Sequence, residues 1–274
     1  MKFVHPHWLL ACFCSLLLLA CTGALTVGDA RQIAIEDQIV SAFENSTTVV
    51  QYAFIANIKD GRGYTAGRAG FTSGTGDMLE VVKEYQKQSP DSVLASYLAP
   101  LQRVNGSDSV AGLDGIEQAW KRAATDARFI AAQDAVNDRL YRQPARSLAA
   151  RLGLRLPFSK LAIYEAGIQH GHGEDYDSVN KIAERATVAA RGAPTSGIDE
   201  RAWLREFLSE RRNDLLHPAD RATAAGWAAA VSRADAMLSI YDSGNFNLDQ
   251  PIVITVYGDK FTIVAGGGVA AASH

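Results

Sequence analysis

Apolar residues that recur every three or four positions constrain the fold more than any other feature of this chain. In residues 30–43, Ile35, Ile39 and Val40 form one apolar stripe, while Glu36 lies outside it. Comparable spacing continues through most of the sequence, so the chain is predicted to be largely helical. Further helices are expected at residues 78–88, 94–104, 115–124, 129–140, 143–152, 160–169, 199–216 and 221–241.

Strand signals are confined to two short segments that contain glycine. Residues 61–76 alternate short stretches with glycines, which is typical of a small hairpin sheet. Residues 252–257 and 261–264 flank Gly258-Asp259, a favoured hairpin turn. The predicted fold class is therefore mainly α with a small β element (α+β), and Asp77 is expected to cap the helix that follows the first hairpin.

The first 24 residues are predicted to be an export signal. Lys2 precedes an apolar run at residues 8–20, which is too short to span a bilayer comfortably and has the length of a signal-peptide core. The run ends in a Leu-Leu-Ala-Cys sequence that resembles a bacterial lipobox, with Cys21 as the lipidated residue. Ordinary cleavage near Ala24 is the alternative. Residues 25–274 are then expected to be exported as one domain, released or anchored through Cys21, without a transmembrane helix.

The cysteines and the net charge exclude several classes of function. Cys12, Cys14 and Cys21 all lie in the predicted signal, so the mature chain has no structural disulfide, cysteine nucleophile or cysteine-ligated zinc. Loss of the first 20 residues removes the charge of Lys2 and takes the formal net charge from −3 to −4. A mildly acidic chain is a poor candidate for nucleic-acid binding, but it is compatible with a cationic substrate.

The densest group of residues suited to catalysis runs from Glu44 to Gly67. Glu44 follows Val40 by four positions, so it lies at the edge of the apolar stripe, where partial desolvation favours the protonated form that a general acid needs. Asp60 precedes a glycine-rich turn and is expected to stay solvated. Two carboxyl groups in different environments suit glycoside hydrolysis. From spacing alone, a helix-end glutamate and an ordinary Asp-Gly turn are the simpler interpretation.

Two other motifs suggest ligands that their details do not support. Gly61, Gly63 and Gly67 have the wrong interval for a dinucleotide-binding loop, and no Gly-Lys-Ser or Gly-Lys-Thr follows. The His-Gly-His-Gly-Glu sequence at 170–174 contains possible metal ligands, but its glycines indicate a loop and no further strong ligand is near in sequence. Neither motif therefore predicts a dinucleotide or a metal site.

Several motifs together resemble one enzyme family. The sequence Asp-Gly-Arg-Gly-Tyr-Thr-Ala-Gly at 60–67 belongs to the longest and most specific block. This block resembles the N-terminal signature of the chitosanases of glycoside hydrolase family 46. The matching segments lie at residues 44–46, 51–52, 60–67 and 70–77, with weaker matches at 169–171 and 257–259.

The resemblance implies a lysozyme-like fold with two lobes around a substrate cleft. It also implies endo-acting cleavage of β-1,4-linked glucosamine chains, with inversion and without a cofactor. Glu44 matches the general acid, Asp60 the general base, and Thr65 the hydroxyl that holds the attacking water. An inverting pair of carboxyl groups is expected to be at least about 6.5 Å apart.

The same resemblance assigns residues around the catalytic pair. Asp77 matches a carboxylate that binds a substrate amine, and Asn45, Arg62 and His170 are expected to bind substrate or line the cleft. A charge network behind the general acid is expected from Glu165, which stands where the family has an aspartate, together with Arg211 and Arg221.

The expected partners are chitosan or glucosamine oligosaccharides, bound by a monomer. Two alternatives stay open. A lysozyme-like peptidoglycan hydrolase would share the fold and the paired carboxyl groups. A non-catalytic surface protein that binds cationic polysaccharide would share the acidic surface.

Overall fold

The computed structural model describes residues 27–221 and 224–264. The predicted export signal, with its three cysteines and its cleavage site, lies outside the described residues. In the described part of the chain, no helix combines the length and the apolar character needed to cross a membrane.

The described chain is mainly helical with two small antiparallel sheets, which confirms the predicted fold class. The strands are β1 (Ile55–Ala56), β2 (Thr65–Ala66), β3 (Phe71–Thr72), β4 (Ile252–Val256) and β5 (Asp259–Ile263). The α-helices are α1 (Val27–Asn45), α2 (Asp77–Gln88), α3 (Leu98–Val104), α4 (Ile116–Ala123), α5 (Ala127–Asn137), α6 (Gln143–Leu152), α7 (Pro157–His170), α8 (Val179–Ala189), α9 (Glu200–Leu216) and α10 (Ala224–Asp242). Short 3₁₀ turns lie at Ala95–Tyr97 and Pro194–Ser196, and a π-helical turn, η2, at Asp138–Arg142.

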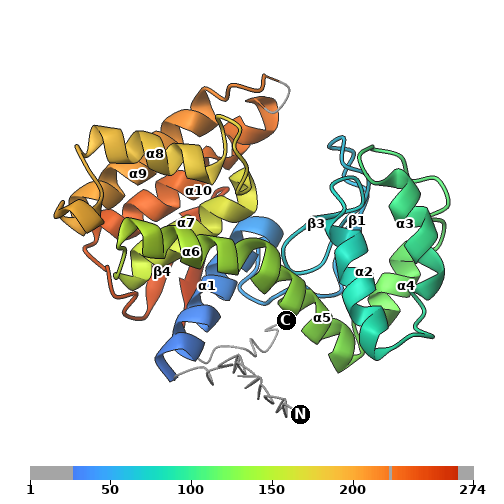
Figure 1. Ribbon diagram of the computed structural model, residues 1–274. Helices are drawn as coiled ribbons and strands as arrows, with labels where there is room; N and C mark the ends of the chain where they lie inside the picture. The colour runs from blue at the N-terminus through green and yellow to red at the C-terminus, as the bar shows by residue number, and fades with distance from the viewer. Residues whose placement is uncertain (1–26, 222–223, 265–274) are drawn as a thin grey trace, which may run out of the picture.

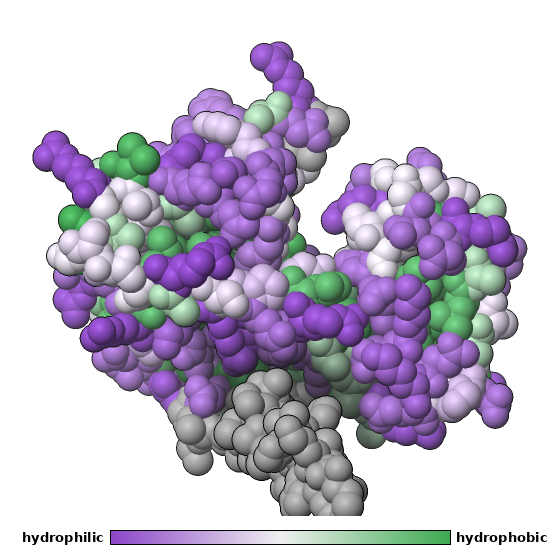
Figure 2. All heavy atoms as spheres, viewed as in Figure 1, coloured by the Kyte–Doolittle hydropathy of each residue, from purple (hydrophilic) through white to green (hydrophobic). Residues whose placement is uncertain are grey.

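Two separate hydrophobic cores divide the described chain into two lobes. The larger lobe packs α1, α6 to α10, β4 and β5 around Trp203, Phe207 and their neighbours. The smaller lobe packs β1 to β3 and α2 to α5 around Trp120 and Phe129. In Figure 1 the two lobes stand side by side, with α5 and α6 running between them. Figure 2 shows the surface deeply hollowed between the two lobes.

The connection between the lobes is a nearly continuous helical run. The sequence predicts separate helices at 129–140 and 143–152, but the π turn η2 joins α5 directly to α6. Pro144, which has no backbone N–H to donate inside the run, lies two residues after the π turn ends. The π turn adds one residue to the helical run where the two cores meet. The side chains that follow it therefore point in different directions than they would on a continuous α-helix.

An ion-pair chain also crosses between the lobes. Asp37 of α1 binds Arg68 of the smaller lobe at 2.5 Å and Arg142 of η2 at 2.7 Å through the same oxygen. Arg142 also pairs with Glu36 at 3.1 Å, and Arg68 pairs with Asp134 of α5. These five residues are called the inter-lobe ion chain below.

The β1–β3 sheet depends on one crowded glycine. Gly67 follows β2 with a φ of +70°, which disfavours any other residue. A Cβ built at Gly67 would lie 2.3 Å from the Gln133 side-chain oxygen and 3.1 Å from Trp120. That oxygen of Gln133 accepts the backbone N–H of Arg68 at 3.1 Å. This close approach therefore holds the hairpin against α4 and α5.

The second hairpin turns one residue earlier than the sequence predicts. Strands β4 and β5 pair from Ile252↔Ile263 to Val256↔Asp259, so Tyr257 and Gly258 form the turn. Both have positive φ, 54° and 91°, as a two-residue type I′ turn requires. The left-handed conformation of Tyr257 is the unusual feature, because that position generally favours Asn, Asp or Gly.

Candidate active site

Glu44 lies in the last turn of α1, in the larger lobe, and its Oε2 adjoins Gly70 of the smaller lobe. Its side chain is 22% exposed, and its Oε1 forms an ion pair with Nη1 of Arg233 at 2.7 Å. The neighbouring Phe43 is buried, with its ring 5.4 Å from the Arg233 guanidinium carbon. Glu44 therefore lies at the edge of the apolar stripe of α1, as predicted. One side of its side chain is packed and the other is open to solvent.

Arg233 connects Glu44 to a fully buried carboxylate. Arg233, from α10, contacts Oε1 of Glu165 through Nε at 2.9 Å. Arg211, from α9, pairs with both oxygens of Glu165 and donates to Gln169 at 2.9 Å. Burial alone would raise the pKa of Glu165, but Arg211 and Arg233 outweigh it and hold the pKa below its ordinary value. Glu165 stays ionised and fixes the guanidinium that reaches Glu44.

Arg221 does not belong to this network, which corrects the sequence prediction. It is exposed in the turn before α10 and forms no ion pair with any residue of the described ranges. Arg233 takes the expected place because it lies on the buried face of α10, beside Ala234 and Met237. A single arginine inside an apolar helical stripe was the available signal, since such a side chain is rarely buried without a carboxylate partner.

Tyr257 is a further residue of the site that the sequence analysis did not assign. Its hydroxyl lies near enough to Arg233 for the two groups to interact. Burial, with the nearby carboxylates of Glu44 and Glu165, raises the pKa of Tyr257 despite that arginine. The left-handed turn between β4 and β5 thus places the neutral phenol of Tyr257 near Arg233, the arginine that pairs with Glu44.

Asp60 lies in the loop between β1 and β2, on the smaller lobe. Its side chain is 26% exposed and is held by Arg62, whose Nη2 lies 2.6 Å from Oδ2. The Arg62 backbone N–H also donates to Oδ1 at 3.1 Å. Asp60 is therefore an oriented, solvated carboxylate, and Arg62 acts on it directly.

Two polar atoms near Glu44 are buried without a hydrogen-bond partner among the described residues, Oγ1 of Thr65 and Nδ2 of Asn45. A Cβ built at Gly70 would lie 3.5 Å from both Glu44 Oε2 and Thr65 Cγ2, so these two side chains adjoin the same point. Buried polar groups in folded proteins nearly always have a partner. A donor or acceptor from water or a ligand would satisfy both.

Asp77 begins α2, and Gly76 rather than Asp77 is the N-cap. The Asp77 carboxylate instead accepts from the Thr72 backbone N–H at 2.6 Å and from the Tyr141 hydroxyl at 3.0 Å. Burial raises the pKa of Asp77 against these hydrogen bonds. It lines a cavity of about 300 Å³ together with Glu80 and Asn105. Tyr141, on η2, is near both Asp77 and Glu44. Burial is the main cause that raises the pKa of Tyr141, and the negative charges of these two carboxyl groups raise it further.

His170 does not reach the hollow, contrary to the sequence prediction. Its side chain is 0% exposed and 3.6 Å from Asp214. Its Nδ1 donates to the Asp177 carbonyl at 2.9 Å, and its ring packs edge-on against Trp227. The histidine ends α7 facing inward, so it supports the loop after α7 rather than binding a ligand from the hollow.

The described residues contain no group of three or more His, Cys, Asp or Glu side chains arranged to hold a metal ion. In the 170–174 segment, Glu174 points to Lys181 at 3.4 Å, while His170 is buried. The possible ligands of this segment therefore do not converge.

The arrangement suits acid–base hydrolysis of a glycosidic bond. A partly packed carboxyl group, braced by a buried arginine, stands on the larger lobe. A solvated carboxylate stands on the smaller lobe, and the Thr65 hydroxyl, which has no partner among the described residues, lies on strand β2 of the same lobe. Each of the two carboxyl groups is thus partly exposed and oriented by an arginine, and a pair of such groups is what glycoside hydrolysis uses.

Comparison with known proteins agrees with this class. The model of glycosyl hydrolase family 46 matches residues 38–252. A chitosanase of Bacillus subtilis is 45% identical over 218 residues, which are 79% of each chain. A chitosanase of a Streptomyces species is 40% identical over 85% of this chain and 81% of its own length. The chain belongs to glycosyl hydrolase family 46, so the resemblance inferred from its motifs is confirmed.

Solved structures are similar over nearly their whole length. The complex of a Gynuella sunshinyii chitosanase of this family with chitotetraose is 42% identical, with a TM-score of 0.82, covering 88% of this chain and 99% of that one. A native chitosanase from Bacillus subtilis gives the same TM-score at 43% identity. The two-lobed fold is thus shared with these enzymes, and the chain is a glycosyl hydrolase.

Proposed function

We propose that this enzyme is an endo-acting, inverting chitosanase that cleaves β-1,4 linkages between glucosamine units. The observation that carries the proposal is the pairing of Glu44 with Arg233, which Glu165 fixes in turn, while Asp60 stands partly exposed on the other lobe. The relatives named as chitosanases, at 38–45% identity, support the same substrate.

In the proposed mechanism, Glu44 donates its proton to the glycosidic oxygen as the bond to the anomeric carbon breaks. Asp60 takes a proton from a water molecule that attacks this carbon from the opposite face. Thr65 holds the water through the hydroxyl that has no partner among the described residues. The two carboxyl groups are expected to be at least about 6.5 Å apart, because the water must fit between Asp60 and the sugar.

The substrate's charge explains the acidic groups around the hollow. Glucosamine units carry ammonium groups, and Asp77 is proposed to bind one of them beside Tyr141. Asn45 is proposed to donate to a sugar oxygen, and Arg62 to orient Asp60. Exposed ion pairs each contribute only about 0–1 kcal/mol, so affinity for a long chain comes from several of them together.

The test is activity on highly deacetylated chitosan with separate substitutions of the two carboxyl groups. Glu44→Gln and Asp60→Asn should each lower kcat by about 10²–10⁴. Glu184→Gln, at an exposed carboxylate paired with Lys181, is the matched control and should keep wild-type activity. NMR of the first product should show inverted anomeric configuration. Full activity in both variants, or retention of configuration, would refute the mechanism.

We also propose export of residues 25–274 as a single two-lobed catalytic domain and a monomer. Residues 1–24 would be removed in the released form, whereas the lipoprotein form would lose residues 1–20 and keep Cys21 as its lipid attachment site. Mass spectrometry of the mature chain distinguishes cleavage before Cys21 from cleavage near Ala24. Light scattering of the purified enzyme measures the oligomeric state, and a dimeric mass would contradict the proposal.

A further inference from the structure

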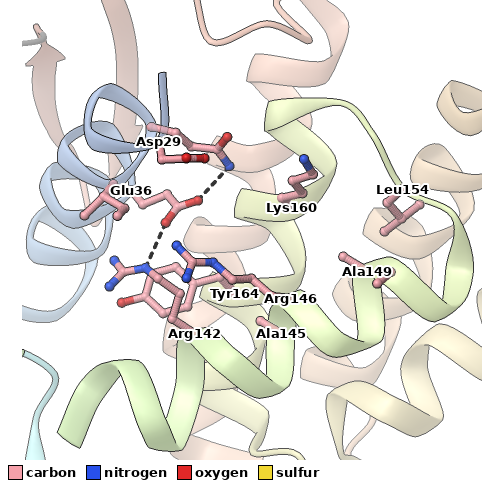
Figure 3. Close-up of a pocket in the computed structure, with 12 residues that line it drawn as sticks. Asp29, Glu36, Arg142, Ala145, Arg146, Ala149, Leu154, Lys160 and Tyr164 are labelled. Carbon is pink, nitrogen blue, oxygen red and sulfur yellow. Dashed lines mark hydrogen bonds and ion pairs between the residues drawn. The ribbon is translucent and has the colours of Figure 1, made fainter. Parts of the chain in front are cut away.

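A cavity of about 370 Å³ lies beside the first half of α1, between this helix, α6 and α7. None of the residues proposed for catalysis or chitosan binding lines it. Glu36, which does, precedes Glu44 by eight residues, or about 12 Å along the helix axis. Figure 3 shows Arg146 and Lys160 extending toward the cavity from α6 and α7, opposite Glu36 and Asp29 of α1.

The carboxylates of this cavity already have partners. Glu36 accepts from Gln32 at 2.8 Å and from Nε of Arg142 at 3.1 Å. Asp29 also has an interaction partner. These two groups therefore have limited capacity to bind a cation.

The cationic side chains that line the cavity have fewer ion-pair partners than the carboxylates. Lys160 forms no ion pair with the residues that the structure describes, and Arg146 has only a 3.8 Å contact with Asp138. Arg142 uses Nε for Glu36 and Nη2 for Asp37, and no described residue accepts from its Nη1. The uncompensated charge that faces the cavity is therefore positive, and an anion would balance it.

The remaining wall is apolar. Ala145, Ala149 and Leu154 line the side between α6 and the start of α7 (Figure 3). The volume is within the range of small-molecule sites, and such sites combine an apolar wall with a few polar groups that fix orientation. A ligand with a charged head and a short aliphatic body would use both parts.

We propose that this cavity binds a small aliphatic carboxylate, with its head on Arg146 and Lys160 and its body against Ala149 and Leu154. A carboxylate fits better than a phosphate ester, because Glu36 and Asp29 repel a dianion more strongly than a monoanion. The site is independent of the chitosan reaction, so it stands or falls separately from the proposed function.

The test is calorimetric titration of the full chain with 4-methylpentanoate, compared with the neutral amide and the amine of the same carbon skeleton and with inorganic phosphate. The carboxylate should bind one saturable site, and the other three probes at least about tenfold more weakly. Absence of saturable carboxylate binding, or equal binding of the amine or phosphate, would overturn the proposal.

Substitutions then locate the site. Lys160→Met and Arg146→Met keep an aliphatic stem and remove the charge from side chains that are at least partly exposed, so the fold is expected to survive. Each should weaken carboxylate binding severalfold, and the pair together by about tenfold or more. Lys121→Met, an exposed lysine of α4, should change nothing. Undiminished affinity in the double variant would refute this location. Arg142 is not substituted, because its buried pairs hold the lobes together.

Discussion

Arg233 has two carboxylate partners, so this one residue fixes the position of Glu44 relative to Glu165. Its planar guanidinium reaches Glu44 at 2.7 Å through one nitrogen and Glu165 at 2.9 Å through another. Burying such charges is costly, and the arrangement is favourable only because every ion has an opposite partner in fixed geometry. Lysine, a single point charge on a flexible stem, cannot reproduce this fork.

Arg233→Lys is therefore expected to lower kcat on chitosan by about 10²-fold, since small errors in the placement of a catalytic group have effects of that size. KM should change little, because the substrate-binding side chains are untouched. Steady-state kinetics measures both. Arg205→Lys, at an exposed arginine paired with Asp242, is the control and should behave as wild type. A wild-type kcat in the Arg233 variant would show that Glu44 needs no such brace.

The buried Asp214 gives a pH prediction. Burial raises its pKa from 3.8 to about 6, although Arg185 opposes the shift. The native state therefore binds a proton more tightly than the unfolded chain, so this group lowers the free energy of unfolding as pH rises from about 4 to 6. Asp214→Asn should remove up to about 3 kcal/mol of this decline.

Urea unfolding of both proteins at several pH values between 4 and 7 measures the effect. The Arg185 ion pair exists only where Asp214 is ionised, so its loss is part of the pH-dependent difference, and His170 is present in both proteins. The slope difference between the curves therefore reports Asp214. Parallel curves would contradict the assigned shift.

How far single residues could be predicted depends on how local their partners are. Glu44 and Asp60 were candidates because of a helix edge and a glycine turn, and the family resemblance assigned their roles. Arg221 precedes α10 and Arg233 lies in its middle, and the contact with Glu165 that selects Arg233 is distant in the sequence. The inward turn of His170 likewise depends on Asp177, Asp214 and Trp227, which no local pattern connects to it.

At the scale of elements, the regular helices were predictable and the irregular joints were not. Helix α8 was missed because it is bounded by glycine-rich loops at 171–178 and 192–197 that dominate the local pattern. Strand β1 has two residues, too few for a period-two signal. The π turn η2 depends on the meeting of two cores, so the sequence suggested a break between α5 and α6 where the structure has continuity.

The close contact at Gly67 makes a prediction for the β1–β3 sheet. Gly67→Ala should lower the free energy of unfolding by about 2–4 kcal/mol, because it adds left-handed strain and displaces the Gln133 oxygen from its buried hydrogen bond. Gly106→Ala is the matched control, with φ of +86° and no atom within 4 Å of the added Cβ. It should cost only about 1–2 kcal/mol. Equal costs in urea denaturation would show that Gly67 is needed for its conformation alone.

At the scale of the whole molecule, two cores are joined across a hollow by one helical run and one ion-pair chain. Apolar periodicity identified the helices but not their division between cores, because spacing on one helix does not specify its neighbour. The two-lobed arrangement was expected from the family resemblance. The inter-lobe ion chain, in contrast, joins residues as distant as Asp37 and Arg142, and no motif marks it.

The shared carboxylate of Asp37 predicts how the lobes are coupled. Asp37→Asn would leave Arg68 and Arg142, both nearly buried, with one carboxylate partner each. Unpairing buried charge is destabilising, so the free energy of unfolding should fall by about 2–4 kcal/mol, the remaining partners limiting the loss. Because each lobe keeps its own core, calorimetry should also show the single transition broaden or split. Asp242→Asn, at an exposed ion pair, should leave it unchanged. An Asp37 variant that melts like the wild type would mean that the helical run alone couples the lobes.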